Sequence, residues 1–252
     1  MADKPSVIRE TDEEARGLAR ALLRSASYAS LSVLEPGTGF PFVSRTLVGT
    51  APDCAPIILV SALSTHTKAL LADGRASLLA GEPGKGDPLA HPRVTVQCLA
   101  DPVDRDSAIH ATLRRRFLAR HPKAALYIDF PDFRFFRLTP QRASLNGGFG
   151  RAYLLEGSDF VIPPSIANQM ERYEQDLLDT INAGWPDIIS RLAAARGRNP
   201  AKGRCRLVGI DPAGLDLKNG DTLIRKEFGR IVDSIESMRT LLNELNIPVF
   251  QN

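Results

Sequence analysis

The sequence has 252 residues, of which 43% are hydrophobic and 24% are charged, a composition that is ordinary for a globular protein of one large or two modest domains. A formal net charge of +3 gives no reason to expect a nucleic-acid partner, and no apolar run reaches the about 18 residues that predict a membrane-spanning helix. Three widely spaced cysteines favour a reducing, cytoplasmic location over a disulfide framework, and no Cys or His spacing indicates a metal site.

The first half of the chain is rich in strand patterns. The segment from Met1 to Glu14 is polar and acidic, unlike a secretory signal. Thr11 and Glu14 have the spacing of a capping box, which predicts a helix from there to about Ala26 with Thr11 as its N-cap. Apolar or alternating runs predict strands at 29–33, 42–48, 56–63, 76–80, 94–100, 133–138 and 142–145, and further helices at 65–72 and 106–120. Because such a sheet must close or be covered to remove its edges, we predict a small antiparallel barrel.

The predicted helix at 106–120 combines an apolar stripe with a high positive charge. The stripe consists of Ile109, Leu113 and Phe117, and the charge comes from Arg114, Arg115, Arg116 and Arg120. A run of charge on a helix is usually a solvated face. We therefore expect these arginines to lie in water.

The composition changes after about residue 155, and residues 157–164 are predicted to form a linker. Helices are expected at 165–182, 186–195 and 232–245, with a polar loop at 197–203 and a strand at 205–210. Two further strands, 215–218 and 222–225, flank Asn219 and Gly220, the dipeptide typical of a type I′ hairpin. The sequence therefore predicts an α+β protein with two domains, residues 1–156 and 165–252.

Three short segments of the first domain contain residues that could bind a ligand. The predicted helix start at 64–68 presents hydroxyls, a lysine and free N–H groups, which suit an anion such as phosphate, although Ser or Thr there is also usual as a cap. Arg45 lies within a largely apolar strand, so we expect it to pair with a phosphate or with a buried carboxylate. The glycine-rich loop 146–151 either lets backbone approach a ligand closely or forms a flexible exit from the barrel.

Several of these segments resemble a known superfamily. Residues 116–127, 130–133 and 146–152 resemble the pyridoxamine 5′-phosphate oxidase-like split barrels, and residues 61–70 are similar to the helix-start motif of the branch that includes HugZ-type haem-utilisation proteins. Residues 211–217, with Arg225 and Phe228, resemble the small C-terminal domain often fused to that barrel. The resemblance implies an FMN-binding antiparallel split β-barrel over residues 1–156, a small α+β domain over residues 165–252, and a homodimer with two FMN sites at the subunit interface.

The same resemblance implies a set of flavin-contacting residues. They are Arg45, Leu47, Ser61, Ser64, His66, Thr67, Lys68, Gln141, Arg142, Asn146, Gly147, Gly148 and Phe149. The sequence departs from the family pattern at two places. The family commonly has Asn at the position of Lys68. The acidic, His-containing run of the relatives' C-terminal domain is absent from residues 182–187. All four histidines lie in the first domain, so a haem ligand would by elimination be His91, His110 or His121.

These observations lead to three competing functions. The first is an FMN-dependent oxidoreductase of unknown substrate, in which the flavin performs the redox chemistry and a cation such as Arg45 favours its reduced form. The second is a non-catalytic flavin- or haem-binding regulatory protein of tetrapyrrole metabolism. The third is a haem-degrading oxygenase. No catalytic residue is assigned, and neither a nucleic acid nor a membrane is expected as a partner.

Overall fold

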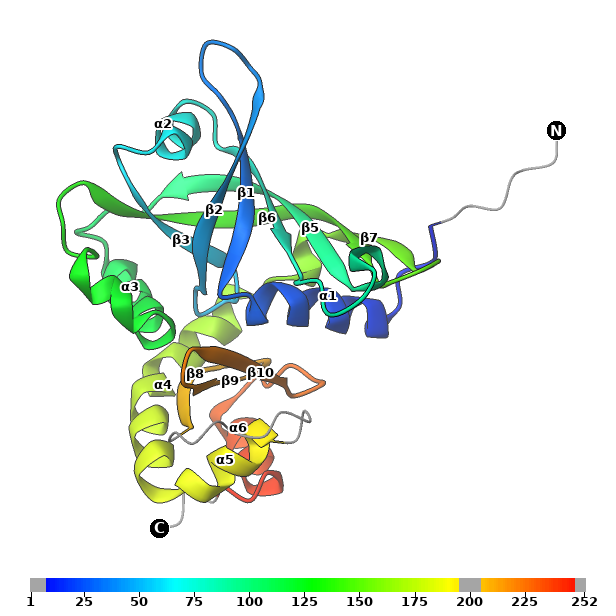
Figure 1. Ribbon diagram of the computed structural model, residues 1–252. Helices are drawn as coiled ribbons and strands as arrows, with labels where there is room; N and C mark the ends of the chain where they lie inside the picture. The colour runs from blue at the N-terminus through cyan, green and yellow to red at the C-terminus, as the bar shows by residue number, and fades with distance from the viewer. Residues whose placement is uncertain (1–7, 195–204, 248–252) are drawn as a thin grey trace.

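The computed structural model describes residues 8–194 and 205–247. The strands of its larger sheet are β1 (Tyr28–Leu34), β2 (Pro41–Thr50), β3 (Pro56–Ser61), β4 (Arg75–Ala80), β5 (Arg93–Pro102), β6 (Phe133–Asn146) and β7 (Ala152–Glu156). They pair antiparallel in the order β3-β2-β1-β4-β5-β6-β7, and β3 also pairs with β6 (Figure 1). Six strands therefore close into a barrel, with β7 added at one end of β6. The predicted α+β split-barrel fold class is confirmed.

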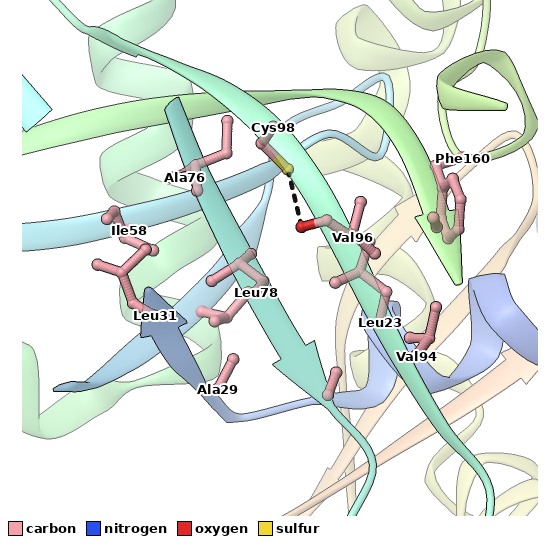
Figure 2. Packing of buried hydrophobic residues seen from close by; sticks show 14 of the residues in the cluster. Leu23, Ala29, Leu31, Ile58, Ala76, Leu78, Val94, Val96, Cys98 and Phe160 are labelled. Atoms are coloured by element: carbon pink, nitrogen blue, oxygen red, sulfur yellow. Dashed lines mark hydrogen bonds between the residues drawn. The ribbon is translucent and has the colours of Figure 1, made fainter. Parts of the chain in front are cut away.

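Alternating side chains fill the interior of the barrel. Leu31, Leu78 and Val96 come from neighbouring strands and point into one shared core (Figure 2). Helix α1 (Glu13–Ser25) adds Leu23 to this core and covers one end of the barrel, while α2 (Thr65–Ala72) lies at the opposite end (Figure 1). Helix α3 (Ala108–Arg120) instead packs against the outside, where the rings of Phe117 and Phe135 meet edge to face at 5.4 Å.

Two local predictions for this half were wrong. The N-cap of α1 is Asp12, whose carboxylate accepts from the Ala15 N–H at 2.8 Å, because the Thr11 hydroxyl donates instead to the Leu154 carbonyl of the unpredicted strand β7. The strands expected at 133–138 and 142–145 are one continuous strand, β6. A bulge opposite Gln97 and Cys98 accommodates the extra residue, so the turn-like break in the pattern does not end the strand.

The remaining elements form a second, smaller sheet with its own helices. They are α4 (Pro164–Gly184), α5 (Pro186–Ala194), β8 (Arg206–Asp211), β9 (Gly214–Asn219), β10 (Thr222–Glu227) and α6 (Ile235–Glu244), and short 3₁₀ turns occur at Pro88–Ala90, Pro122–Leu126 and Gly157–Asp159. The sheet order is β10-β9-β8, and α4, α5 and α6 share a hydrophobic core with it. The loop predicted at 197–203 lies outside the described residues. No helix in the described part of the chain has the length and apolarity needed to cross a membrane.

The hairpin and the last helix are shifted from their predicted positions. Asn219 pairs with Thr222, so Gly220 and Asp221 are the two central residues of the turn. Gly220 has φ +59° while Asp221 does not have a positive φ, which is the pattern of a type II′ turn rather than type I′. Helix α6 begins at Ile235 because the Ser234 hydroxyl caps it by accepting from the Ser237 N–H.

Residues 157–164 pack tightly instead of forming a loose linker. Phe160 and Ile162 are buried, and the Ile162 N–H donates to the Asp53 carbonyl at 2.9 Å. A Cβ added to Gly157 would come within 2.1 Å of the Pro140 carbonyl oxygen, so only glycine fits there. The division of the chain into two domains stays a prediction, because this segment joins the two sheets through buried contacts.

The two sheets meet across a cluster of buried charges, which corrects the expectation for the basic helix. Arg114 does form an exposed pair with Asp129, but Arg116 and Arg120 are buried. Arg116 pairs with Glu174 of α4, and Arg120 lies 3.5 Å from Asp216 of β9. Arg24 and Arg225 complete the cationic side of this junction, and Asp211 and Glu227 complete its acidic side. Arg116 and Arg120 of α3 therefore contact α4 and β9 rather than water, whereas Arg114 stays on the surface.

Candidate functional site on the barrel face

The chain between β3 and α2 is held by two of the predicted site hydroxyls. The Ser61 hydroxyl donates to Asp132 Oδ2 at 2.7 Å, and the Thr67 hydroxyl donates to the Ser61 carbonyl at 2.6 Å. Thr67 is fully buried. Both hydroxyls therefore shape the helix start, and neither is left to contact an anion directly.

The first turn of α2 leaves other groups open. The Ser64 side chain makes no capping hydrogen bond, so the N–H groups of Thr65 and His66 have no acceptor among the described residues. The Lys68 side chain is exposed one residue beyond Thr67. These donors and the Lys68 ammonium give the end of the barrel a positive potential.

His66 has the geometry of an oriented imidazole. Its Nδ1 lies 3.0 Å from the Ser44 hydroxyl of β2, and the ring is half-buried. Burial lowers the pKa of His66, so the ring is neutral at pH 7. The other nitrogen, Nε2, has no hydrogen-bond partner among residues 8–194 and 205–247. Ser44 escaped the sequence analysis, although strand alternation places it on the opposite side of β2 from Arg45.

Arg45 is exposed on the outer side of β2. Its guanidinium carbon lies 5.1 Å from the centre of the Tyr28 ring, a cation–π contact with the neighbouring strand. No buried carboxylate pairs with Arg45 among the described residues, which removes that alternative. Leu47, two residues further, is half-buried against the cluster beneath α3. A hydrogen bond and the charge of Glu82 raise the pKa of the Tyr28 phenol.

Arg45 lies in a broad outer face of the barrel that is low in charge. Strand register gives two adjacent rows of outward residues across β2, β1, β4, β5 and β6. The first row is Arg45, Ser30, Leu79, Thr95 and Ser144, and the second is Val43, Ser32, Ser77, Gln97 and Arg142. Neither row contains an acidic residue, and Val43 and Leu79 leave 63% and 42% of their surfaces exposed. We call these ten residues the barrel face.

The later predicted site residues lie at the far side of this face. Arg142 contacts the Gln97 side chain, while Gln141 occupies the bulge and donates to the Thr139 carbonyl at 3.2 Å. In the loop at 146–149, the Asn146 side chain accepts from the Gly148 N–H, and Phe149 is 72% exposed. Along the row, β1, β4 and β5 lie between Arg142 of β6 and Val43 of β2. Within the described residues, no hydrogen bond or ion pair joins the residues at 141–149 to those of α2.

The other three histidines contact other groups of the protein, away from α2. His121 Nε2 donates to the Val48 carbonyl at 2.9 Å, and burial lowers the pKa of His121 to about 4. His91 Nε2 lies 3.1 Å from the Lys85 carbonyl, and His110 packs edge to face on Phe135 at 5.5 Å. Within the described ranges, no group of three or more His, Cys, Asp or Glu side chains is arranged to hold a metal ion. His66 is thus the histidine best placed to meet an external ligand.

Comparison with known proteins places the chain in a family. Residues 10–161 match the family described as "CREG, beta-barrel". An Arabidopsis thaliana protein described as "Non-canonical heme oxygenase HOZ, chloroplastic" is 34% identical over 213 residues, which are 82% of this chain but only 64% of that protein. The chain thus spans less than two thirds of that relative's length.

Two solved structures extend the similarity to nearly the whole chain. A protein of unknown function from Agrobacterium tumefaciens superposes with a TM-score of 0.80 at 30% identity, covering 96% of this chain and 100% of that one. A heme binding protein from Mycobacterium smegmatis superposes with a TM-score of 0.55 at 26% identity, covering 96% and 99%. Together with the barrel geometry, these matches show that the chain belongs to the CREG β-barrel family of split barrels.

Proposed function

We propose that this protein binds haem beside His66, at the end of the barrel where α2 lies, and opens the haem ring oxidatively. The relatives described as a heme oxygenase and a heme binding protein support this function. The observation that carries it is the half-buried His66, whose Nδ1 is 3.0 Å from Ser44 and whose Nε2 has no partner within the described residues.

The residues around His66 fit the chemistry of an iron porphyrin. A metal-bound imidazole uses one neutral nitrogen as ligand and fixes its ring through a hydrogen bond of the other. Ser44 supplies that second contact, and burial keeps the ring neutral by lowering the pKa of His66. Haem, when bound, supplies a redox-active iron and is itself the substrate.

The surroundings of His66 also match the rest of the haem molecule. Lys68 is an exposed cation two residues from His66 and is suited to a charge-assisted hydrogen bond with a propionate. Leu63, just before the start of α2, exposes 80% of its surface, which provides apolar contact for a porphyrin. The role of this chain is therefore to hold the iron ligand in place, to bind the carboxylates and to cover the ring.

A second copy of the chain completes this proposal. The barrel face is open, uncharged apart from its arginines, and apolar at Val43 and Leu79, as expected of a surface that another subunit covers. In the proposed homodimer, the loop 146–149 of one copy would approach the His66 region of the other. Such a dimer would bring the two groups of predicted residues together at one site.

Haemin titration tests this function. We expect a saturable shift of the Soret band with one haem per chain. Because the pKa of His66 lies below the usual 6.5 of histidine, the affinity should hold as the pH falls to about 6.5 and decline only at lower pH, where the imidazole protonates. A spectrum that stays that of protein-free haemin at all ratios would exclude the proposed function.

Flavin binding is the second candidate, favoured by the open start of α2. The N–H groups of Thr65 and His66, together with Lys68, suit the phosphate of FMN. In the same experiment, FMN is titrated with the protein, and binding is detected as quenching of the flavin fluorescence. Binding of FMN without binding of haemin would replace the haem function with a flavin-dependent oxidoreductase or a flavin-binding regulator.

A further inference from the structure

A second potential ligand site lies where α3 meets the smaller sheet. A cavity of about 610 Å³ opens there, on a different side of the barrel from α2, as the positions of α2, α3 and α4 in Figure 1 show. Leu118 of α3, Leu178 of α4 and Leu207 of β8 give it an apolar lining. Its volume falls within the range of about 300–1,000 Å³ that is typical of small-molecule sites.

The charged groups at this cavity are predominantly basic. Arg115, Arg206 and Lys218 line it, and among the described lining residues Asp179 alone is acidic. Arg115 already pairs with Glu174 of the junction, and Asp179 accepts a hydrogen bond from the Gln175 amide at 2.9 Å. The positive charge available to a ligand therefore comes from Arg206 and Lys218.

Neither of these two cations forms an ion pair within the described part of the chain. The Lys218 ammonium donates to the Arg120 backbone carbonyl at 2.5 Å, and no carboxylate among the described residues lies within ion-pair distance of it. Burial lowers the pKa of Lys218, and the more distant charge of Asp221 offsets that effect only in part. Arg206 is exposed and forms no ion pair within residues 8–194 and 205–247. A bound anion would supply the missing negative charge.

We propose that this junction cavity binds an organic anion with an apolar body, such as an aromatic carboxylate or sulfonate. The leucines would contact the body, and Arg206 and Lys218 would contact the acidic group. A ligand of this kind touches α3 of the barrel as well as α4 and β8 of the second unit. It therefore stabilises the contact between the barrel and the smaller sheet, so binding of the ligand should also stabilise the folded chain.

The matched dyes anilinonaphthalene sulfonate and phenylnaphthylamine test the proposal, because they share an apolar body and differ in the sulfonate. We expect the sulfonate dye to bind the full chain about tenfold more tightly than its neutral counterpart, as a charge-assisted contact requires. We also expect it to raise the unfolding temperature. Equal affinities of the two dyes, or no binding of the sulfonate dye, would overturn the proposal.

Three variants locate the binding. Ala119→Trp fills the cavity from α3, and Arg206→Glu reverses an exposed charge at its rim; each should weaken sulfonate-dye binding about tenfold. Lys85→Glu makes the same charge change in an exposed loop of the barrel and should leave the affinity unchanged. Unaltered binding in both cavity variants, or equal loss in all three, would show that the dye binds elsewhere or responds only to net charge.

Discussion

Replacing Arg225 with Met is expected to lower the free energy of unfolding by about 3–5 kcal/mol, the usual cost of removing one partner from a buried ion pair. The Arg225 guanidinium donates to both carboxylate oxygens of Asp211, at 2.6 and 2.7 Å, and to Asp216 at 3.1 Å. All three side chains are buried. Without Arg225, the charge of Asp211 stays buried with no cation in direct contact. Urea unfolding of wild type and variant measures the difference.

An exposed arginine provides the matched control for this prediction. Arg230 pairs with Glu244 at 3.2 Å, but more than half of each side chain is exposed. Arg230→Met should therefore cost less than about 1 kcal/mol. Adding Asp211→Asn to Arg225→Met removes the stranded charge and should recover part of the loss. A cost for Arg225→Met no larger than that for Arg230→Met would contradict the structure of the junction.

The pH dependence of stability has a defined sign at Asp211. Burial alone would raise the pKa of Asp211, but the Arg225 guanidinium holds that pKa well below its usual range. The carboxylate therefore stabilises the folded chain fully above the ordinary pKa of about 3.9. Its contribution is lost as the pH falls below that value towards the lowered pKa. This part of the junction thus persists through mildly acidic conditions.

Replacing His66 with Ala is expected to weaken haemin binding about a hundredfold. Even outer-shell partners of a metal ligand contribute about 10–100-fold to affinity, and loss of the ligand itself belongs at the upper end of that range. Ser44→Ala leaves the imidazole but removes its orienting contact at 3.0 Å, so it should weaken binding about tenfold. Haemin titrations followed at the Soret band compare the three proteins.

His91 serves as the control for the loss of a histidine. It lies far along the chain from α2, and its Nε2 contacts the Lys85 carbonyl of an exposed loop. His91→Ala should bind haemin like the wild type. Wild-type affinity in His66→Ala would mean that another group ligates the iron, and equal weakening in His91→Ala would mean that the effect is not specific to the proposed site.

Short sequence patterns predicted those helices and strands whose ends are set by neighbouring residues in the chain. The helix expected at 65–72 is α2 with those bounds, because a strand of apolar residues runs directly into a Ser- and Thr-rich helix start. Strand alternation located β1, and a run rich in apolar residues located β4, each to within one residue. The resemblance to split barrels then supplied the closure of the sheet, which no local pattern encodes.

The errors arose where distant residues decide the outcome. Arg116 and Arg120 have the sequence pattern of a solvated face, yet Glu174 and Asp216 lie about 60 to 100 residues away along the chain and bury them. Thr11 has the pattern of an N-cap, but its hydroxyl donates a hydrogen bond to the Leu154 carbonyl. In the candidate site, the sequence placed His66 and Lys68 on the helix that is α2, and their role as ligand-binding residues stays a prediction. The contact between His66 and Ser44 depends on how α2 folds over β2.

Aerobic incubation of the haem complex with ascorbate tests the central claim most directly, because ascorbate supplies electrons and air supplies O₂. If the chain opens the haem ring, the Soret band will decay in the wild type, an open-chain tetrapyrrole will form, and His66→Ala will lose most of this activity at matched haem occupancy. Haem that stays bound and intact under these conditions would contradict the proposed enzyme and leave a protein that only binds haem.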